Sequence, residues 1–140
     1  ADKYRIIAKE KGVSLNTVYS KDLPLVYADI ALIDRALQNI IDNAIAHCKK
    51  GDVITLELSR EDQEVKIIIS DTGCGIAEQE LPHIFERYRK GKFLNDTKEG
   101  SGLGLAIVKR IMDLHNINIG VKSALNQGTA FFFNLPIHQH

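Results

Sequence analysis

Three polar residues that can bind a ligand recur one turn apart in a long helical segment. Asn39, Asn43 and His47 are spaced by four residues, so they fall within about 80° of each other on a helix, beside its apolar face. Asparagine is a poor helix former because its amide competes with the backbone. Two asparagines in one helix therefore need a reason. Either their side chains are exposed or paired with a neighbouring loop, or their amide oxygens are neutral ligands of the kind that suits Mg²⁺.

A carboxylate ends an apolar strand just before a glycine-rich turn. Asp71 closes the segment EVKIIISD and is followed by Thr72-Gly73-Cys74-Gly75. Glycines let a ligand approach the backbone closely, and a carboxylate in a pocket accepts a hydrogen bond from an amino group. The same residue types begin ordinary turns. The motif alone does not distinguish a pocket from a turn.

A second run of glycines leads into a helical pattern. In KEGSGLGLAIVKRI, from Lys98 to Ile111, three glycines stand at alternate positions. The free N–H groups and the positive dipole end of a helix attract phosphate, although glycines also cap helices without binding anything. A dinucleotide site is disfavoured, because no strand leads directly into these glycines and no ribose-binding acid follows in a βαβ context.

The order of these features along the chain is more specific than any one of them. Between the two glycine runs lies a loop of about 30 residues that carries a basic run, and loops of this length are usually functional or mobile. An asparagine-bearing helix, an acid before glycines, a long loop and a glycine-rich helix start supply a magnesium ligand, an amine acceptor, a flexible cover and a phosphate cradle. Together they predict an ATP site.

The elements that position these residues alternate between helical and strand patterns. We expect helices at 1–12, 30–48 and 103–115, strands at 13–20 and 23–29, a hairpin of strands 53–60 and 64–71, a short amphipathic stretch at 81–88, and a second hairpin of strands 117–123 and 128–137. Helices and antiparallel hairpins in this order predict an α+β fold, a two-layer sandwich with helices on one face of a mixed β-sheet.

Composition limits the class of protein. The 140 residues suit a single domain, residues 1–140. The 18 basic and 18 acidic residues cancel, so no net field draws the chain to nucleic acid. Cys48 and Cys74 have neither metal spacing nor a disulfide framework, which fits a reducing compartment such as the cytoplasm. No apolar run approaches the roughly 20 residues of a membrane-spanning helix.

The chain resembles the catalytic ATP-binding domain of bacterial sensor histidine kinases, in the superfamily shared with gyrase, mismatch-repair ATPases and a heat-shock chaperone. Residues 34–44 are similar to the family's N-box, DTGCGI to its first glycine box, IFERYRKGK to its F-box and GSGLGLAIVKRI to its second glycine box. The tail, with Ser123, Gly128-Thr129 and Asn134-Leu135-Pro136, resembles the closing hairpin. The resemblance spans residues 24–137 and implies the Bergerat ATP-binding fold.

The resemblance also implies roles for single residues of the helix and the strand end. Asn43 would ligate Mg²⁺, Asn39 would support the phosphates as part of the catalytic site, and Asp71 would accept a hydrogen bond from the adenine amine. The family often carries a lysine three residues after the magnesium ligand, where this chain has Ala46. His47 would either replace that lysine at the phosphates or pack in the interior.

The loops complete the site that the resemblance implies. The stretch 88–99 would form a lid over ATP, anchored by Phe85, with Arg89 or Lys90 near the γ-phosphate as catalytic cations. The remaining nucleotide contacts would come from the two glycine boxes and the start of the lid: Gly73, Gly75, Ile76, Tyr88, Gly100, Ser101, Gly102, Leu103, Gly104 and Leu105. After the last helix the family usually has Gly-Gly, where this chain has Asn116-Ile117, and Asn tolerates a left-handed conformation.

The identity of residue 39 bears on the reaction. In the ATP-hydrolysing relatives a glutamate at this position activates water, whereas the amide of Asn39 cannot take a proton at neutral pH. Hydrolysis should therefore be slow, and phosphoryl transfer needs mainly positioning and charge neutralisation. In the kinases the acceptor is a histidine on a separate dimerisation domain, and none of the five histidines here has the sequence context of an acceptor.

Three functions remain at this point. The resemblance implies a kinase domain that moves the γ-phosphoryl of Mg-ATP to a histidine on the dimerisation domain of a homodimeric, membrane-anchored parent protein, which then serves a response regulator. Ala46 motivates the alternative of a degenerate module that binds nucleotide without transferring phosphate. A gyrase-like hydrolase is disfavoured because Asn39 is not acidic.

Overall fold

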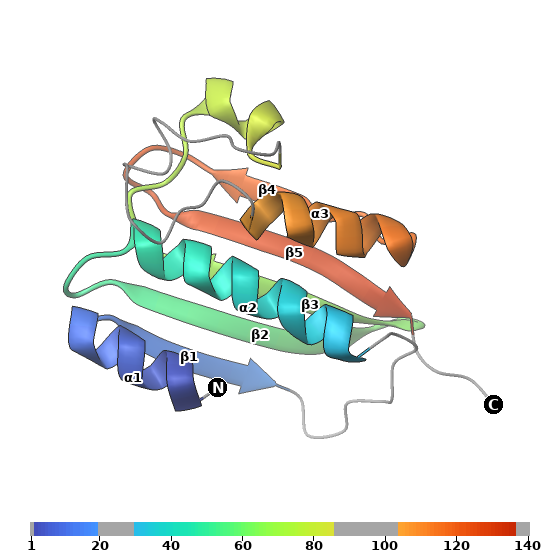
Figure 1. Ribbon diagram of the computed structural model, residues 1–140, viewed down its shortest axis with the longest axis horizontal. Coiled ribbons are helices and arrows are strands. Elements are labelled where there is room, and N and C mark those ends of the chain that lie inside the picture. Colours follow the sequence, from blue (N-terminus) through green and yellow to red (C-terminus); the bar gives the residue numbers. More distant parts are fainter. Residues whose placement is uncertain (1, 20–29, 86–103, 137–140) are drawn as a thin grey trace.

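The computed structural model describes residues 2–19, 30–85 and 104–136. Its elements are α1 (Asp2–Lys11), β1 (Ser14–Tyr19), α2 (Ile30–His47), β2 (Val53–Glu61), β3 (Glu64–Asp71), the 3₁₀ helix η1 (Glu78–His83), α3 (Gly104–Leu114), β4 (Gly120–Ser123) and β5 (Thr129–Pro136). The described strands form a mixed sheet in the order β1-β2-β3-β5-β4 (Figure 1). In this sheet β1 runs parallel to β2, and the other neighbouring strands are antiparallel.

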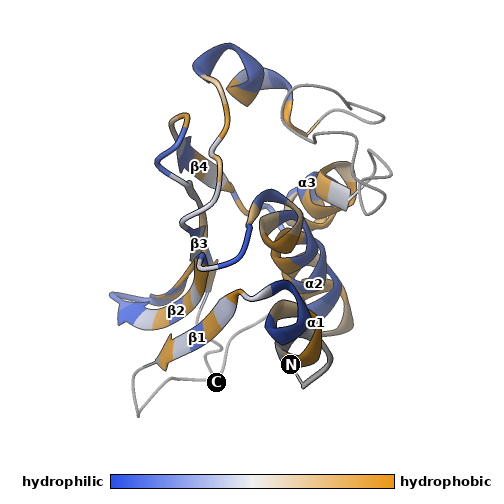
Figure 2. Ribbon diagram, turned by 90° about the vertical axis from the view of Figure 1, so that its left-hand side faces the viewer, coloured by the Kyte–Doolittle hydropathy of each residue, from blue (hydrophilic) through white to orange (hydrophobic). Residues whose placement is uncertain are grey.

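The helices lie on one face of the sheet, which gives two layers (Figure 2). Strand β3 alternates between half-buried and buried positions, so that Ile67 and Ile69 face the helices. Phe131 and Phe133 of β5 are buried beside them, and Ile40 of α2 closes over the same core. This arrangement confirms the predicted α+β sandwich.

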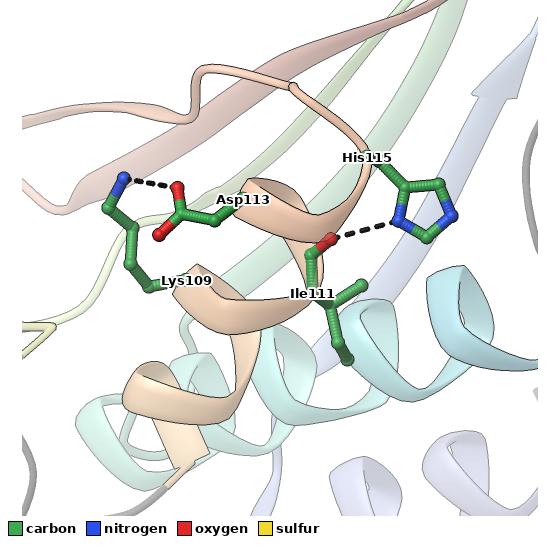
Figure 3. A network of polar contacts seen from close by, with 4 residues as sticks. All are labelled: Lys109, Ile111, Asp113 and His115. Atoms are coloured by element: carbon green, nitrogen blue, oxygen red, sulfur yellow. Dashed lines mark hydrogen bonds and ion pairs between the residues drawn. The ribbon is translucent and has the colours of Figure 1, made fainter.

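Helix α3 ends as predicted, in a turn that uses asparagine in place of glycine. Asn116 has φ +56°, and the N–H of Ile117 reaches back to the carbonyl of Met112 at 2.8 Å. Such a bond satisfies a carbonyl that has no partner within the helix. Nδ1 of His115 lies 2.9 Å from the carbonyl of Ile111 (Figure 3), which gives the last turn a second contact.

Three predicted elements differ from the structure or fall outside it. The expected strand 117–123 begins only at Gly120, because Ile117 is 7% exposed and its backbone closes α3 instead. Of the expected amphipathic stretch 81–88, residues 86–88 lie outside the described residues. In the described part the 3₁₀ helix η1 begins earlier, at Glu78, and ends at His83, with Pro82 inside it. The expected strand 23–29 lies outside the described residues.

The structure also bears on the cysteines and on membrane spans. Cys48 and Cys74 are free thiols, and burial, with a contribution from the charge of Asp71, raises the pKa of Cys48 to about 12. This thiol is therefore protonated and unreactive near neutral pH. No helix in the described part of the chain combines the length and apolar character needed to cross a membrane.

Candidate functional site

The amide of Asn39 lies on the side of α2 that meets the start of α3, and Asn43 follows one turn later on the same side of the helix. Both Nδ2 atoms are buried, and neither has a hydrogen-bond partner among the described residues. A Cβ atom added to Gly104, the first residue of α3, would lie 4.0 Å from Oδ1 of Asn39, so this amide faces the start of that helix. Buried amides without partners are rare in folded proteins, and a bound ligand is one way to satisfy them.

The last residue of α2 ties this helix to the glycine loop that follows β3. The carbonyl of His47 accepts a hydrogen bond from the N–H of Cys74 at 3.2 Å. A Cβ atom on Gly73 would come within 2.5 Å of the same carbonyl oxygen, so no side chain fits at that position. The His47 ring is buried, with 4% of the residue exposed, as the packing alternative from the sequence requires. The loop and the helix therefore hold a fixed relation to each other.

Asp71 is a buried carboxylate at the base of the glycine loop. It is 7% exposed, and its Oδ1 accepts a hydrogen bond from the N–H of Gly73 at 2.8 Å. Burial raises the pKa of Asp71 to about 6, against the lowering effect of hydrogen bonds from the Gly73 and Thr129 backbones, and the charge of Asp52 raises it further. The group is ionised at neutral pH and is a strong acceptor in a poorly hydrated position.

The hairpin of β4 and β5 supports the other side of the loop. Gly75 has φ +75°, and a Cβ there would lie 2.0 Å from the carbonyl oxygen of Ala124. The N–H of Asn126 donates to the carbonyl of Cys74 at 2.7 Å, and the N–H of Ile76 donates to Oγ of Ser123 at 2.7 Å. Sequence reasoning missed the last contact, because no local pattern indicates a bond between residues 47 positions apart.

The close approach at Gly75 predicts a specific effect of a methyl group. We expect Gly75→Ala to lower the free energy of unfolding by roughly 3 kcal/mol or more, because the clash with Ala124 adds to the cost of a positive φ. The matched control is Gly51→Ala, since Gly51 has φ +95° but nothing within 4 Å of an added Cβ. Chemical denaturation gives the free energy of unfolding of both variants, and the larger loss in Gly75→Ala measures the clash with Ala124. Equal losses in the two variants would contradict the clash.

The other predicted site residues divide between the described and the remaining parts of the chain. Ile76 is fully buried, Leu105 is 6% exposed, and the ring of Phe85 meets that of Phe131 edge-on at 6.2 Å. The predicted residues that lie outside the described residues are Tyr88, Arg89, Lys90, Gly100, Ser101, Gly102 and Leu103. The structure therefore brings together Asn39, Asn43, Asp71, Gly73 and Gly104 in one region between α2, the glycine loop and the start of α3.

The residues of this region fit a cation that takes most of its ligands from a bound anion. Within the described ranges there is no group of three His, Cys, Asp or Glu residues that could hold a metal ion. Nδ2 of Asn43 is buried without a hydrogen-bond partner among the described residues, and Oδ1 of the same amide is a neutral oxygen ligand. Mg²⁺ is commonly bound by one or two protein oxygens together with substrate phosphates and waters, so the donor set is compatible with this ion.

Comparison with known proteins gives the family. Residues 28–139 match the model of the family described as "Histidine kinase-, DNA gyrase B-, and HSP90-like ATPase". The chain belongs to this family. The adaptive-response sensory kinase SasA of Rippkaea orientalis is 41% identical over 137 residues, which cover 97% of this chain and 35% of that protein. The chain thus spans about a third of the length of this relative.

Solved structures of this family share the fold. The mycobacterial sensor histidine kinase MprB matches with a TM-score of 0.82 and 28% identity, over 99% of this chain and 94% of that one. Full-length ShkA in complex with AMPPNP matches with a TM-score of 0.83 and 31% identity, over 99% of this chain and 28% of that one. The chain therefore has the fold of the catalytic ATP-binding domain of sensor histidine kinases, as its sequence motifs predicted.

Proposed function

We propose that this chain is a single catalytic domain that binds Mg-ATP and transfers the γ-phosphoryl group to a histidine on a separate dimerisation domain of its parent protein. The observation that carries the proposal is the pair of buried Nδ2 atoms of Asn39 and Asn43, which have no hydrogen-bond partner among the described residues and lie on α2 between the glycine loop with Asp71 and the start of α3. A nucleotide that lies along α2 satisfies both amides and the carboxylate at once.

The geometry suggests how the nucleotide lies. Asn39 and His47 are two turns apart, about 12 Å along the helix axis, and the glycine loop with Asp71 joins α2 at its His47 end. Adenine would lie at that end, with its amino group on Asp71 and its ring against Gly73, Gly75 and Ile76. The phosphates would lie at the other end, in the cradle of residues 100–105.

The two asparagines would serve the phosphates. The oxygen of Asn43 would hold Mg²⁺, and Asn39 would contact the phosphate side. When bound, Mg²⁺ neutralises the charge that develops on the phosphoryl oxygens. Because Asn39 cannot act as a general base, water is poorly activated and transfer to another nucleophile is favoured over hydrolysis. Arg89 or Lys90 would add positive charge near the γ-phosphate.

The proposed partners supply the acceptor histidine, because none of the five histidines in this sequence has the context of an acceptor. The phosphoryl group would pass to the histidine of the dimerisation domain and then to a response regulator. The parent would be a homodimer anchored in the membrane, with this domain in the cytoplasm. Nucleic acid is not expected as a partner, because the acidic and basic residues of the sequence balance.

One experiment separates the kinase from a module that only binds nucleotide. The domain, Mg²⁺ and ATP labelled at the γ-phosphate are mixed with the histidine-bearing domain of the parent protein. We expect acid-labile, base-stable label on that domain, as phosphohistidine requires. Nucleotide binding without label would favour the module, which Ala46 motivates because the family often has lysine there and because this alanine is only 9% exposed.

The affinity for the adenine group should depend on pH through Asp71. The adenine amino group needs the ionised carboxylate of Asp71 as its acceptor. Since the pKa of Asp71 in the empty domain is about 6, lowering the pH below this value protonates the carboxylate and removes the acceptor. We expect the affinity to be constant above pH 7 and to fall by up to about tenfold per pH unit below the pKa. Calorimetry with adenosine, which has no titrating phosphate, measures the effect, and an affinity that stays constant below the pKa would contradict this role of Asp71.

A further inference from the structure

A row of polar side chains crosses the sheet at the end that carries the glycine loop. Asp71 of β3 pairs with Thr129 of β5, and Thr129 pairs with Ser123 of β4. Directly paired residues face the same side of a sheet, so the three side chains point toward the helix layer. Asp71 and Thr129 are both buried.

The hydroxyl of Ser123 uses all of its hydrogen-bonding capacity within the protein. Its Oγ lies 2.7 Å from the N of Ile76, 2.8 Å from the carbonyl oxygen of Gly128 and 2.8 Å from Oγ1 of Thr129. A serine hydroxyl has one donor and two acceptor positions. Ser123 accepts from Ile76 and donates to Gly128, so Thr129 is left to donate to it.

The row thereby holds the glycine loop at both ends. Asp71 accepts the N–H of Gly73 at 2.8 Å, and Ser123 accepts the N–H of Ile76. Between them, the N–H of Cys74 donates to the carbonyl of His47 on α2. Ser123 also fixes Thr129, whose backbone hydrogen bond lowers the pKa of Asp71. The position of the loop and the charge of Asp71 are therefore linked through one hydroxyl group.

We propose that Ser123 is a positioning residue of the adenine pocket: it clamps the end of the glycine loop at Ile76 and holds Thr129, the residue that pairs with Asp71 across the sheet. The proposal rests on the proposed function above, in which adenine lies against this loop. Ser123 acts through Ile76 and Thr129 and need not touch the nucleotide.

The test compares Ser123→Ala with Ser123→Thr and with a control in the same sheet. We expect Ser123→Ala to weaken adenosine and ATP binding by about tenfold, equally with Mg²⁺ and with EDTA, and to raise the apparent pKa of adenosine binding. Ser123→Thr keeps the hydroxyl and should restore both. The control is Asn134→Ala, which removes the 3.0 Å bond from Asn134 to Glu64 at the far end of β3 and β5.

A second measurement needs no nucleotide. The Ile76 amide should exchange its hydrogen at least about tenfold faster in Ser123→Ala than in wild type. The Phe133 amide of β5, in the same sheet as Ser123, should exchange at an unchanged rate. Unchanged exchange and affinity would overturn the clamp, as would an equal affinity loss in Asn134→Ala, which would mark a purely structural effect. Faster Ile76 exchange in a protein that binds neither adenosine nor ATP would overturn the proposed function and not the contact.

Discussion

Asp71→Asn should abolish selective adenine binding while the domain stays folded. An ionised acceptor contributes more to a hydrogen bond than a neutral one, and Asp71 is buried where water does not compete. We expect ATP affinity to fall roughly 100-fold. The preference over GTP should disappear as well, because guanine carries a carbonyl where adenine carries its amino group. Isothermal calorimetry with both nucleotides measures the two effects.

The matched control for this substitution is Asp113→Asn. Asp113 is an exposed acid on α3 that pairs with Lys109 at 2.8 Å (Figure 3), so its replacement removes the same charge far from the glycine loop. Its effect on affinity should be small. Unchanged ATP affinity in Asp71→Asn, with circular dichroism like that of wild type, would remove Asp71 from the pocket.

The ionised carboxylate of Asp71 lowers the stability of the domain when no nucleotide is bound. The pKa of Asp71 rises from 3.8 to about 6 on folding, so the folded state binds the proton more tightly than the unfolded state does. The contribution of this group to stability is therefore fully present below pH 3.8 and is lost as pH rises through 6. The loss corresponds to about 3 kcal/mol. Asp71→Asn should not show this pH-dependent loss of stability, because an amide does not ionise, although it keeps only one of the two acceptor oxygens.

Asn43→Ala should weaken nucleotide binding mainly when Mg²⁺ is present. Nδ2 of this amide is buried without a partner among the described residues, and in the proposed site its oxygen holds the metal ion. We expect the affinity for Mg-ATP to fall roughly 10- to 100-fold and the affinity for ATP in EDTA to change little, because a lost metal ligand matters only while metal is bound. Phosphoryl transfer to the dimerisation domain should fall at least as far.

A control on the same helix separates this effect from loss of helix stability. Gln38→Ala also removes a carboxamide from α2, but Nε2 of Gln38 donates to Asp34 on the helix surface at 2.6 Å. The melting temperature of both variants is measured beside the affinity. An equal loss of affinity with Mg²⁺ and with EDTA in Asn43→Ala would contradict the assignment of Asn43 as the metal ligand.

The parts of the fold that depend on local patterns were predicted from the sequence. The 3.6-residue apolar period of α2 and the alternation in β3 follow from how each element meets the core. The left-handed turn at Asn116 follows from the tolerance of asparagine for that conformation. The family motifs added the order of the site residues, and the family match confirmed the kind of domain they indicate.

The bounds of several elements could not be predicted, because turn contacts and burial decide them and the apolar period of the segment does not. The strand β4 begins at Gly120 because Ile117 closes α3 and enters the core. Residues 78–83 form a 3₁₀ helix around Pro82, whose missing N–H does not suit a longer α-helix.

The sequence by itself determined which residue types stand at the site: two amides one turn apart, a carboxylate before glycines, and a glycine-rich helix start. Only the tertiary structure decided how they meet. The carbonyl of His47 holds Cys74, Ser123 holds Ile76, and burial raises the pKa of Asp71. Spacing and periodicity are properties of a local stretch, whereas burial and hydrogen bonds across the sheet exist only once segments far apart in the chain have packed together.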